Sequence, residues 1–323
     1  MGIESRIERI SRALTQRSRL QPLGLPPLRP GSHRSVHHGR YLPQEFWETS
    51  SDEDRHLARM LAVHRAATTA PVFSHVSAAV LLNLPIYGES GPNVHTNVGP
   101  SGSGRPSGGL IRHKSRLPEG DVVEIAGLRC TSPERTLLDL GCTGPAELAL
   151  ACADGYLRSE FRVARSIDWA RLGEWRDDME RRLHERRAAR GVRTARQVFA
   201  LATPVLDSVL ESVSHLQLRR LGFELELQAS VPGPNGRPYH IDFEFLGLDL
   251  YGECDGKAKY TDPALLGGLT AEQLVYRDKR RQDWICGSTG KALIRWGYSE
   301  AITVRHLARR LRAFNVPIPR PPF

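Results

Sequence analysis

The sequence feature that most constrains the fold is a run of strict alternation, Tyr239–Phe245, in which every second residue is apolar. A turn-forming cluster rich in Pro and Gly, residues 232–238, separates this run from a second alternating stretch, Glu224–Val231. Side chains of a β strand point alternately to its two faces, so the pattern predicts two half-buried strands joined as a hairpin. The side chains predicted to share one core are Tyr239, Ile241, Phe243 and Phe245. The side chains predicted on the polar face are His240, Asp242 and Glu244.

Further elements surround this hairpin. Helices are predicted over residues 209–221, where Gly222 provides the stop, and over residues 272–285 and 301–314. Strands are predicted over residues 248–254 and 292–296. The resulting order, α-β-β-β-α-β-α, is the core order of restriction-endonuclease-like folds. The predicted fold class is therefore α/β (α+β), with a restriction-endonuclease-like αβββαβ module in the last third of the chain.

Three acidic residues are predicted to meet on this module. Glu253 and Asp255 lie two positions apart on one strand, so their carboxylates leave the same face, and Asp242 lies on the neighbouring strand. Carboxylates gathered on one patch repel one another unless a cation lies between them. Hard oxygen ligands favour Mg²⁺ or Mn²⁺, which can polarise a phosphoryl oxygen and supply a hydroxide. Asp242, Glu253 and Asp255 are thus the predicted metal ligands, and Lys257 completes a D-x-K step.

The same residues carry a family resemblance. The chain resembles the Vsr-like branch of the PD-(D/E)xK phosphodiesterases over nearly all of residues 207–314, in the segments Ile241-Asp242-Phe243, Glu253-Cys254-Asp255-Gly256 and Lys259-Tyr260. The resemblance implies metal-dependent hydrolysis of DNA, with Lys257 or Lys259 holding the attacking water or the phosphate. Lys259 stands where the family has a histidine.

Two more positions follow from this resemblance. The family has a glutamate on the preceding helix, which Glu211 matches, and later features that Arg281 and the pair Arg295-Trp296 match. Each has an alternative reading from its local sequence. Ser208 and Glu211 have the spacing of a capping box, so Glu211 can simply close a helix. Arg281 can contact DNA or pair with a carboxylate of the site.

A second resemblance lies in the middle of the chain. The motifs Val72–Ala79 (VFSHVSAA) and Cys130–Asp139 (CTSPERTLLD) resemble the AbiEi-type antitoxin and regulator family of bacteria, over roughly residues 72–157. This implies a DNA-binding transcriptional regulator or an antitoxin with a cognate toxin as partner. Family members typically carry a winged helix-turn-helix ahead of this region. Only a helix over Ile3–Leu14 and a wing-like stretch, Val36–Leu42, match it here, and a proline-rich link lies between them.

Local patterns in this half predict several elements. Ser74 or Ser77 is predicted to cap a helix, and Ser132 followed by Pro133 is predicted to begin another. Residues 122–129 are predicted as a strand region. Residues 168–202 are predicted to be helical and arginine-rich.

The chain is basic, with a formal net charge of +9. Such a balance fits a polyanionic partner, and DNA is the predicted one. The arginines predicted to contact nucleic acid are Arg186, Arg187, Arg190 and Arg281. Mixed charges around the first three also fit a solvated helix face. Five cysteines without a CxxC pair suit a reducing cytoplasm, and no apolar run approaches the ~20 residues that span a bilayer.

The sequence as a whole predicts three regions. Residues 1–70 hold the first helix, the proline-rich linker and a degenerate winged-helix-like region. Residues 71–200 form the AbiEi-like domain, and residues 201–323 the Vsr-like nuclease-fold domain. The predicted function is metal-dependent hydrolysis or nicking of DNA. The alternative is a non-enzymatic DNA-binding regulator or antitoxin that keeps an inactive nuclease fold.

Overall fold

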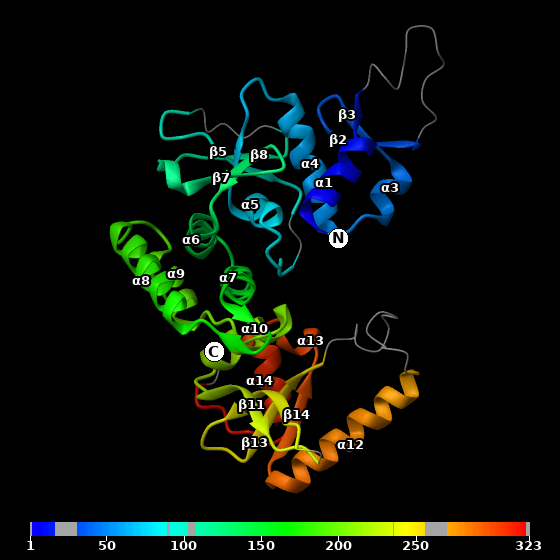
Figure 1. Cartoon of the computed structure of the whole chain (residues 1–323), viewed down its shortest axis with the longest axis vertical. Helices are drawn as coiled ribbons and strands as arrows, with labels where there is room; N and C mark the ends of the chain where they lie inside the picture. The colour runs from blue at the N-terminus through cyan, green and yellow to red at the C-terminus, as the bar shows by residue number, and fades with distance from the viewer. Residues whose placement is uncertain are drawn as a thin grey trace. The chain divides into compact units, whose positions relative to one another are not determined.

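The computed structural model describes residues 2–16, 31–88, 91–102, 108–234, 236–255 and 270–320. The chain forms two compact units (Figure 1). Unit 1 comprises Met1–Tyr156 and Trp169–Ala200, and unit 2 comprises Leu157–Asp168 and Leu201–Phe323. Both units contain helices and sheets, so the predicted mixed α/β class is confirmed.

Unit 1 begins with a helix followed by a small antiparallel sheet. Its first elements are α1 (Ile3–Ala13), β1 (Thr15–Gln16), β2 (His33–His37), β3 (Arg40–Pro43), α3 (Gln44–Thr49) and α4 (Asp52–Ala66). The three strands lie in the order β1-β3-β2. Helix α1 buries Ile7 and Ile10, as its helical spacing predicts. Arg6 donates to the carboxylate of Asp54 at 2.6 Å, which ties α1 to the start of α4.

A five-stranded mixed sheet forms the centre of unit 1. Its elements are β4 (Val72–Phe73), α5 (His75–Leu81), β5 (Val94–Asn97), β6 (Leu110–His113), the 3₁₀ turn Glu119–Asp121, β7 (Val122–Ile125) and β8 (Leu128–Thr131). The strand order is β6-β5-β4-β8-β7. The strand region predicted over residues 122–129 is confirmed and consists of two strands, because Ala126 and Gly127 both have positive φ and form a two-residue hairpin turn.

Four further helices follow in the chain. They are α6 (Pro133–Thr143), α7 (Ala146–Phe161), α8 (Trp169–Glu185) and α9 (Val192–Leu201). They belong to unit 1 except for the end of α7 from Leu157 and the last residue of α9, Leu201. Ser132 accepts a hydrogen bond from the backbone N–H of Arg135 and Pro133 opens the helix, so the predicted start of α6 is confirmed. The arginine-rich segment is helical as predicted, except that residues 186–191 form turns between α8 and α9.

Unit 2 is built around a four-stranded sheet. Its elements are β9 (Arg162–Val163), β10 (Ser166–Ile167), α10 (Val209–Arg220), β11 (Leu225–Val231), β12 (Tyr239–Phe245), β13 (Leu250–Cys254), α12 (Ala271–Thr289), β14 (Ala292–Trp296), α13 (Tyr298–Ala301) and α14 (Val304–Arg312). The sheet order is β11-β12-β13-β14; the first three strands are antiparallel, and β14 runs parallel to β13. Helices α10 and α14 pack on one face and α12 on the other (Figure 1).

One prediction about β12 is wrong. Phe243 and Phe245 pack with Trp296 in the core under α10 and α14, whereas Ile241 belongs to a separate cluster with Tyr251 and Ile285. The apolar side chains of β12 therefore enter two cores rather than one. The change coincides with Gln228 on the neighbouring strand, whose φ of 52° is left-handed and interrupts the regular pleat.

Candidate functional site

Asp242 lies at this interruption of the sheet and is half-buried. Its Oδ2 accepts a hydrogen bond from the backbone N–H of Cys254 on β13 at 2.7 Å. The side-chain amide of Gln228 donates to Asp242 at 3.4 Å and to Glu211 at 3.1 Å. The carboxylate of Asp242 is thus held by a strand on each side, and Gln228 links it to helix α10.

Glu211 has the capping role that its sequence spacing allows. Its backbone N–H donates to Ser208 Oγ at 3.2 Å, and its carboxylate accepts from the hydroxyl of Ser208 at 2.8 Å and from the N–H of Asp207 at 2.9 Å. The same carboxylate receives the amide of Gln228. The cap and the link to Asp242 are therefore present together.

Glu253 is buried on β13 and paired with two guanidinium groups. The distance to Arg281 of α12 is 2.6 Å, and the distance to Arg295 of β14 is 3.0 Å. Arg281 also donates to the carbonyl of His240 at 2.7 Å, and Arg295 also pairs with Asp278. Burial lowers the pKa of Arg295, but Asp278 and the charge of Glu253 outweigh it and raise that pKa. Of the two alternatives for Arg281, the pairing with a carboxylate is the one observed.

Asp255 follows the end of β13. Its backbone N–H donates to the carbonyl of Trp296 at 2.8 Å. Its side chain lines a pocket of about 630 Å³ together with Arg295, Tyr298 and Arg310. Glu300 also lines this pocket, so two carboxylates and two guanidinium groups meet at the carboxyl end of the central strands.

Asp242, Glu253 and Asp255 are not among the groups of three side chains whose ligand atoms are spaced to hold one metal ion. Within the described ranges, a group of three such residues meets this spacing only in unit 1, at the histidines considered below. Lys257 and Lys259 lie outside the described residues. The metal site of unit 2 therefore stays a prediction, with its acidic residues placed on adjacent strands and Glu253 held by arginines.

The arginines predicted to contact nucleic acid have different surroundings. Arg186 pairs with Asp139 at 3.3 Å inside unit 1. Arg187 and Arg190 are exposed in the turns between α8 and α9. Arg281 is engaged by Glu253. Arg187 and Arg190 are therefore the members of this set that point to solvent.

Three histidines gather on one side of the sheet in unit 1. His75 begins α5, His95 lies on β5, and His113 ends β6. His95 Nδ1 lies 2.9 Å from His113 Nε2, and the rings of His75 and His113 stack with centroids 3.5 Å apart. One ligand nitrogen from each lies within 4.8 Å of the other two. Burial is the largest cause that lowers the pKa of each, to about 2 for His75 and about 4 for His95.

Polar groups support this histidine cluster. Ser74 is the N-cap residue of α5, but the predicted side-chain cap is wrong, because its hydroxyl makes no cap hydrogen bond and lies 3.0 Å from His75 Nδ1. Ser77 Oγ accepts the backbone N–H of His95 at 2.8 Å and lies 2.8 Å from His56 Nε2. Both serines therefore fix the histidines rather than the helix end.

A buried arginine lies behind the histidines. Arg135 is fully buried and pairs with Asp139 at 3.0 Å and with Asp121 at 3.1 Å. It also donates to Ser115 Oγ at 2.6 Å and to the carbonyl of Arg116 at 3.0 Å. Burial raises the pKa of Asp139, although Arg135 opposes it. These contacts join α6 to the segment after β6 and fix the wall next to His113.

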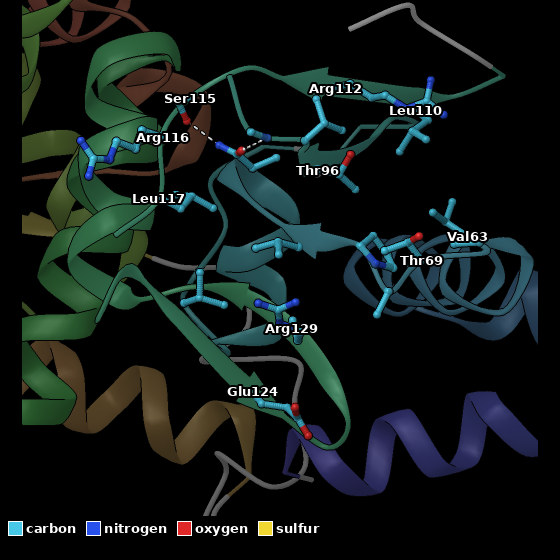
Figure 2. A pocket seen from close by; sticks show the side chains of 18 of the residues that line it. Val63, Thr69, Thr96, Leu110, Arg112, Ser115, Arg116, Leu117, Glu124 and Arg129 are labelled. Atoms are coloured by element: carbon cyan, nitrogen blue, oxygen red, sulfur yellow. Dashed lines mark hydrogen bonds between the residues drawn. The ribbon is translucent and has the colours of Figure 1, made fainter. Parts of the chain in front are cut away.

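Unit 1 also has an open hollow of about 1,020 Å³. Figure 2 shows Arg112, Arg116 and Arg129 around it, with Thr96 and Glu124 among the other lining side chains. The lining mixes apolar groups with charges of both signs. Such a lining does not select one class of ligand.

Comparison with known proteins assigns no activity. No family model matches the chain. It is 29% identical over 164 residues to two uncharacterised proteins of Mycobacterium tuberculosis, one from strain CDC 1551 and one from strain H37Rv. The match covers 50% of this chain and 54% of each relative, so the chain spans about half the length of the curated relatives it matches. Among the described residues, no helix is long and apolar enough to cross a membrane.

Proposed function

We propose that unit 2 acts on DNA and hydrolyses a phosphodiester bond with the help of a divalent metal ion, as its resemblance to the Vsr-like branch implies. The single observation that carries the proposal is the placement of its acidic residues. Phe243 and Gly252 are paired, so Asp242 and Glu253 are the next positions on β12 and β13. Asp255 follows at the end of the same strand.

The topology supports this proposal. The described elements run α10, β11, β12, β13, α12 and β14, and the sheet is an antiparallel meander closed by a parallel fourth strand. This is the αβββαβ order of restriction-endonuclease-like folds. Because many activities share one fold, the topology alone supports the class and the acidic residues must support the chemistry.

The donor chemistry fits a hard cation. Asp242, Glu253 and Asp255 offer only carboxylate oxygens, the ligands that Mg²⁺ and Mn²⁺ prefer. When bound, such an ion polarises a phosphoryl oxygen of the substrate. Glu253 can bind the metal ion only after the substrate has bound, because without substrate Arg281 and Arg295 neutralise its carboxylate. A DNA phosphate attracts the same two guanidinium groups, so substrate binding would release Glu253. Lys257 or Lys259 would orient water or stabilise charge.

A plasmid-nicking assay tests the proposal. Supercoiled DNA is incubated with the full chain and Mg²⁺ or Mn²⁺, and Asp242→Asn and Asp255→Asn are expected to lose the activity. Asp249→Asn is the matched control, since Asp249 is an exposed acid in the turn before β13. Lys257→Met and Lys259→Met then identify the functional lysine by the larger loss. Nicking that survives in both Asn variants contradicts the assignment.

A second candidate function is a non-enzymatic DNA-binding regulator or an AbiEi-type antitoxin, and one observation favours it. Helix α1 is followed by β1, which pairs with β3 of the β2-β3 hairpin in the order β1-β3-β2. A winged helix combines a helix-turn-helix with a small sheet of this kind, and α1 with the sheet β1-β3-β2 matches the sheet-bearing part of it. This function predicts DNA binding that weakens steeply with salt, without nicking, in fluorescence anisotropy with labelled duplex.

A further inference from the structure

The histidine cluster of unit 1 combines ligands from three separate elements. His75 comes from the start of α5, His95 from β5 and His113 from the end of β6. Strands β5 and β6 are parallel, and His95 pairs with Ile111 while Asn97 pairs with His113. Ile111 lies opposite His95, and His113 follows two residues later on β6, so its side chain leaves the same face of the sheet as that of His95. The arrangement depends on tertiary structure and not on a local turn.

The backbone of His75 is held in an uncommon conformation. Its φ is 54°, which is the left-handed region that non-glycine residues seldom occupy. Such conformations are strained and persist where the surroundings impose them, often at functional sites. Here the left-handed turn occurs between the end of β4 and α5, at the residue whose ring stacks on His113.

The cluster also has the spacing that a metal ion needs. Zinc binds imidazole nitrogen at about 2.0–2.1 Å, and a tetrahedral angle then separates two nitrogens by about 3.3 Å. His95 and His113 are at 2.9 Å, and the three ligand atoms all lie within 4.8 Å. The rings of His75 and His113 stack with an interplanar angle of 16°, so binding requires that they turn until both lone pairs point at the ion.

We propose that His75, His95 and His113 bind one divalent transition-metal ion, with Zn²⁺ as the preferred occupant. Three imidazoles are the ligand set of zinc sites that keep a fourth position for water or an exogenous ligand. If Nδ1–H of His75 donates to Ser74 Oγ, its Nε2 lone pair is left for the ion, the support that metal-binding histidines usually have.

This site is independent of the carboxylates in unit 2. Its ligands are nitrogens, which suit Zn²⁺, Co²⁺ or Ni²⁺, whereas Asp242 and Asp255 offer oxygens that suit Mg²⁺. The arginines nearest to the histidines are themselves paired, Arg135 with Asp121 and Asp139, and Arg186 with Asp139. Their charges are therefore partly compensated, so they oppose a bound cation less than isolated charges would.

The first test uses the unaltered full chain. Metal-stripped protein is titrated with Zn²⁺, and X-ray absorption at the zinc edge is recorded on the one-to-one complex. The expected spectrum has three imidazole nitrogens at about 2.0–2.1 Å. Co²⁺ is expected to give the intense visible bands of a tetrahedral nitrogen site. A stoichiometry well below one ion per chain, or a shell of carboxylate oxygens or sulfur, overturns the proposal.

Variants then assign the ligands. His75→Asn and His113→Asn are expected to weaken Zn²⁺ binding at least tenfold, because loss of even a supporting partner typically costs roughly 10–100-fold. Asparagine tolerates the left-handed backbone at position 75, so circular dichroism is expected to show an unchanged fold. His37→Gln on β2 and His215→Gln in α10 are controls for other histidines, and Asp255→Asn is the control for unit 2. Unchanged affinity in both Asn variants, or a loss of affinity confined to a control, contradicts the site.

Discussion

The burial of Arg135 leads to a stability prediction that can be worked out from its contacts. Arg135→Met keeps much of the side-chain volume but removes the partner of two buried carboxylates, Asp121 and Asp139. Breaking a buried ion pair from one side typically costs about 3–5 kcal/mol. For a unit of this size the unfolding temperature is expected to fall by roughly 6–20 °C. Arg181→Met is the matched control, since its ion pairs on α8 are exposed to solvent and contribute little to stability.

Hydrogen-exchange mass spectrometry of the full chain measures this effect unit by unit. Peptides from α6 are expected to lose protection in Arg135→Met, while peptides from β12 keep theirs. The loss is also expected to depend on pH. Burial raises the pKa of Asp139 above its unfolded value, so protonation at low pH relieves the uncompensated charge and stability falls as pH rises through that pKa. A loss under about 1 kcal/mol, or one that is equal at all pH values, would refute the reasoning.

Three other outcomes follow from unit 2. Gly252→Ala is expected to cost about 1–3 kcal/mol in urea unfolding, because its Cβ would lie 2.4 Å from the ring of Trp296; an unchanged midpoint would contradict this contact. Burial lowers the pKa of His215 to about 4, so its contribution to stability is complete above about pH 6.5 and is lost as pH falls toward 4. His215→Leu is expected to remove up to about 3 kcal/mol of this loss of stability at low pH, measured by urea unfolding at pH 4.5 and 7.5. If the wild type and the variant lose the same free energy of unfolding between these pH values, His215 is not the cause. Arg281→Met leaves Glu253 with one guanidinium partner, so Mg²⁺ is expected to raise the melting temperature more than in the wild type, and a smaller rise would argue against a role for Glu253 in metal binding.

The four strands of the sheet in unit 2 and its helices α10, α12 and α14 could be predicted because their signals are local, whereas β9, β10 and α13 were not predicted. Tyr239–Phe245 and Ala292–Trp296 have the bounds that alternation and apolar runs predict. The packing of Ile241 in a second core could not be predicted, because the alternating pattern places all apolar side chains of a strand on one face only if the strand is regularly pleated. The interruption comes from the left-handed backbone of Gln228 on the neighbouring strand, and glutamine gives no local sign of that conformation.

The acidic residues of unit 2 and the histidines of unit 1 also differ in how far their proximity could be predicted from the sequence. Asp242, Glu253 and Asp255 could be found because hairpin geometry places neighbouring strand positions together. The pairing of Glu253 with Arg281 and Arg295 depends on how α12 and β14 pack, so the sequence left Arg281 with two alternatives. His75, His95 and His113 share no fixed spacing, and the parallel pairing of β5 with β6 brings them together. The sequence prediction for this segment concerned only a helix cap, and the hydroxyl of Ser74 makes no cap hydrogen bond.

The course of the chain between the two units constrains how this protein can be divided. The backbone leaves unit 1 after Tyr156, returns at Trp169, and enters unit 2 again at Leu201. A fragment that starts at Leu201 would lack the β9–β10 hairpin, and with it the hydrogen bond from Arg162 to the carbonyl of Val205. Gene fusion, truncation or recombination at one peptide bond therefore cannot transfer unit 2 intact. A complete unit 2 must include Leu157–Asp168 together with Leu201–Phe323, and a complete unit 1 must keep Trp169–Ala200.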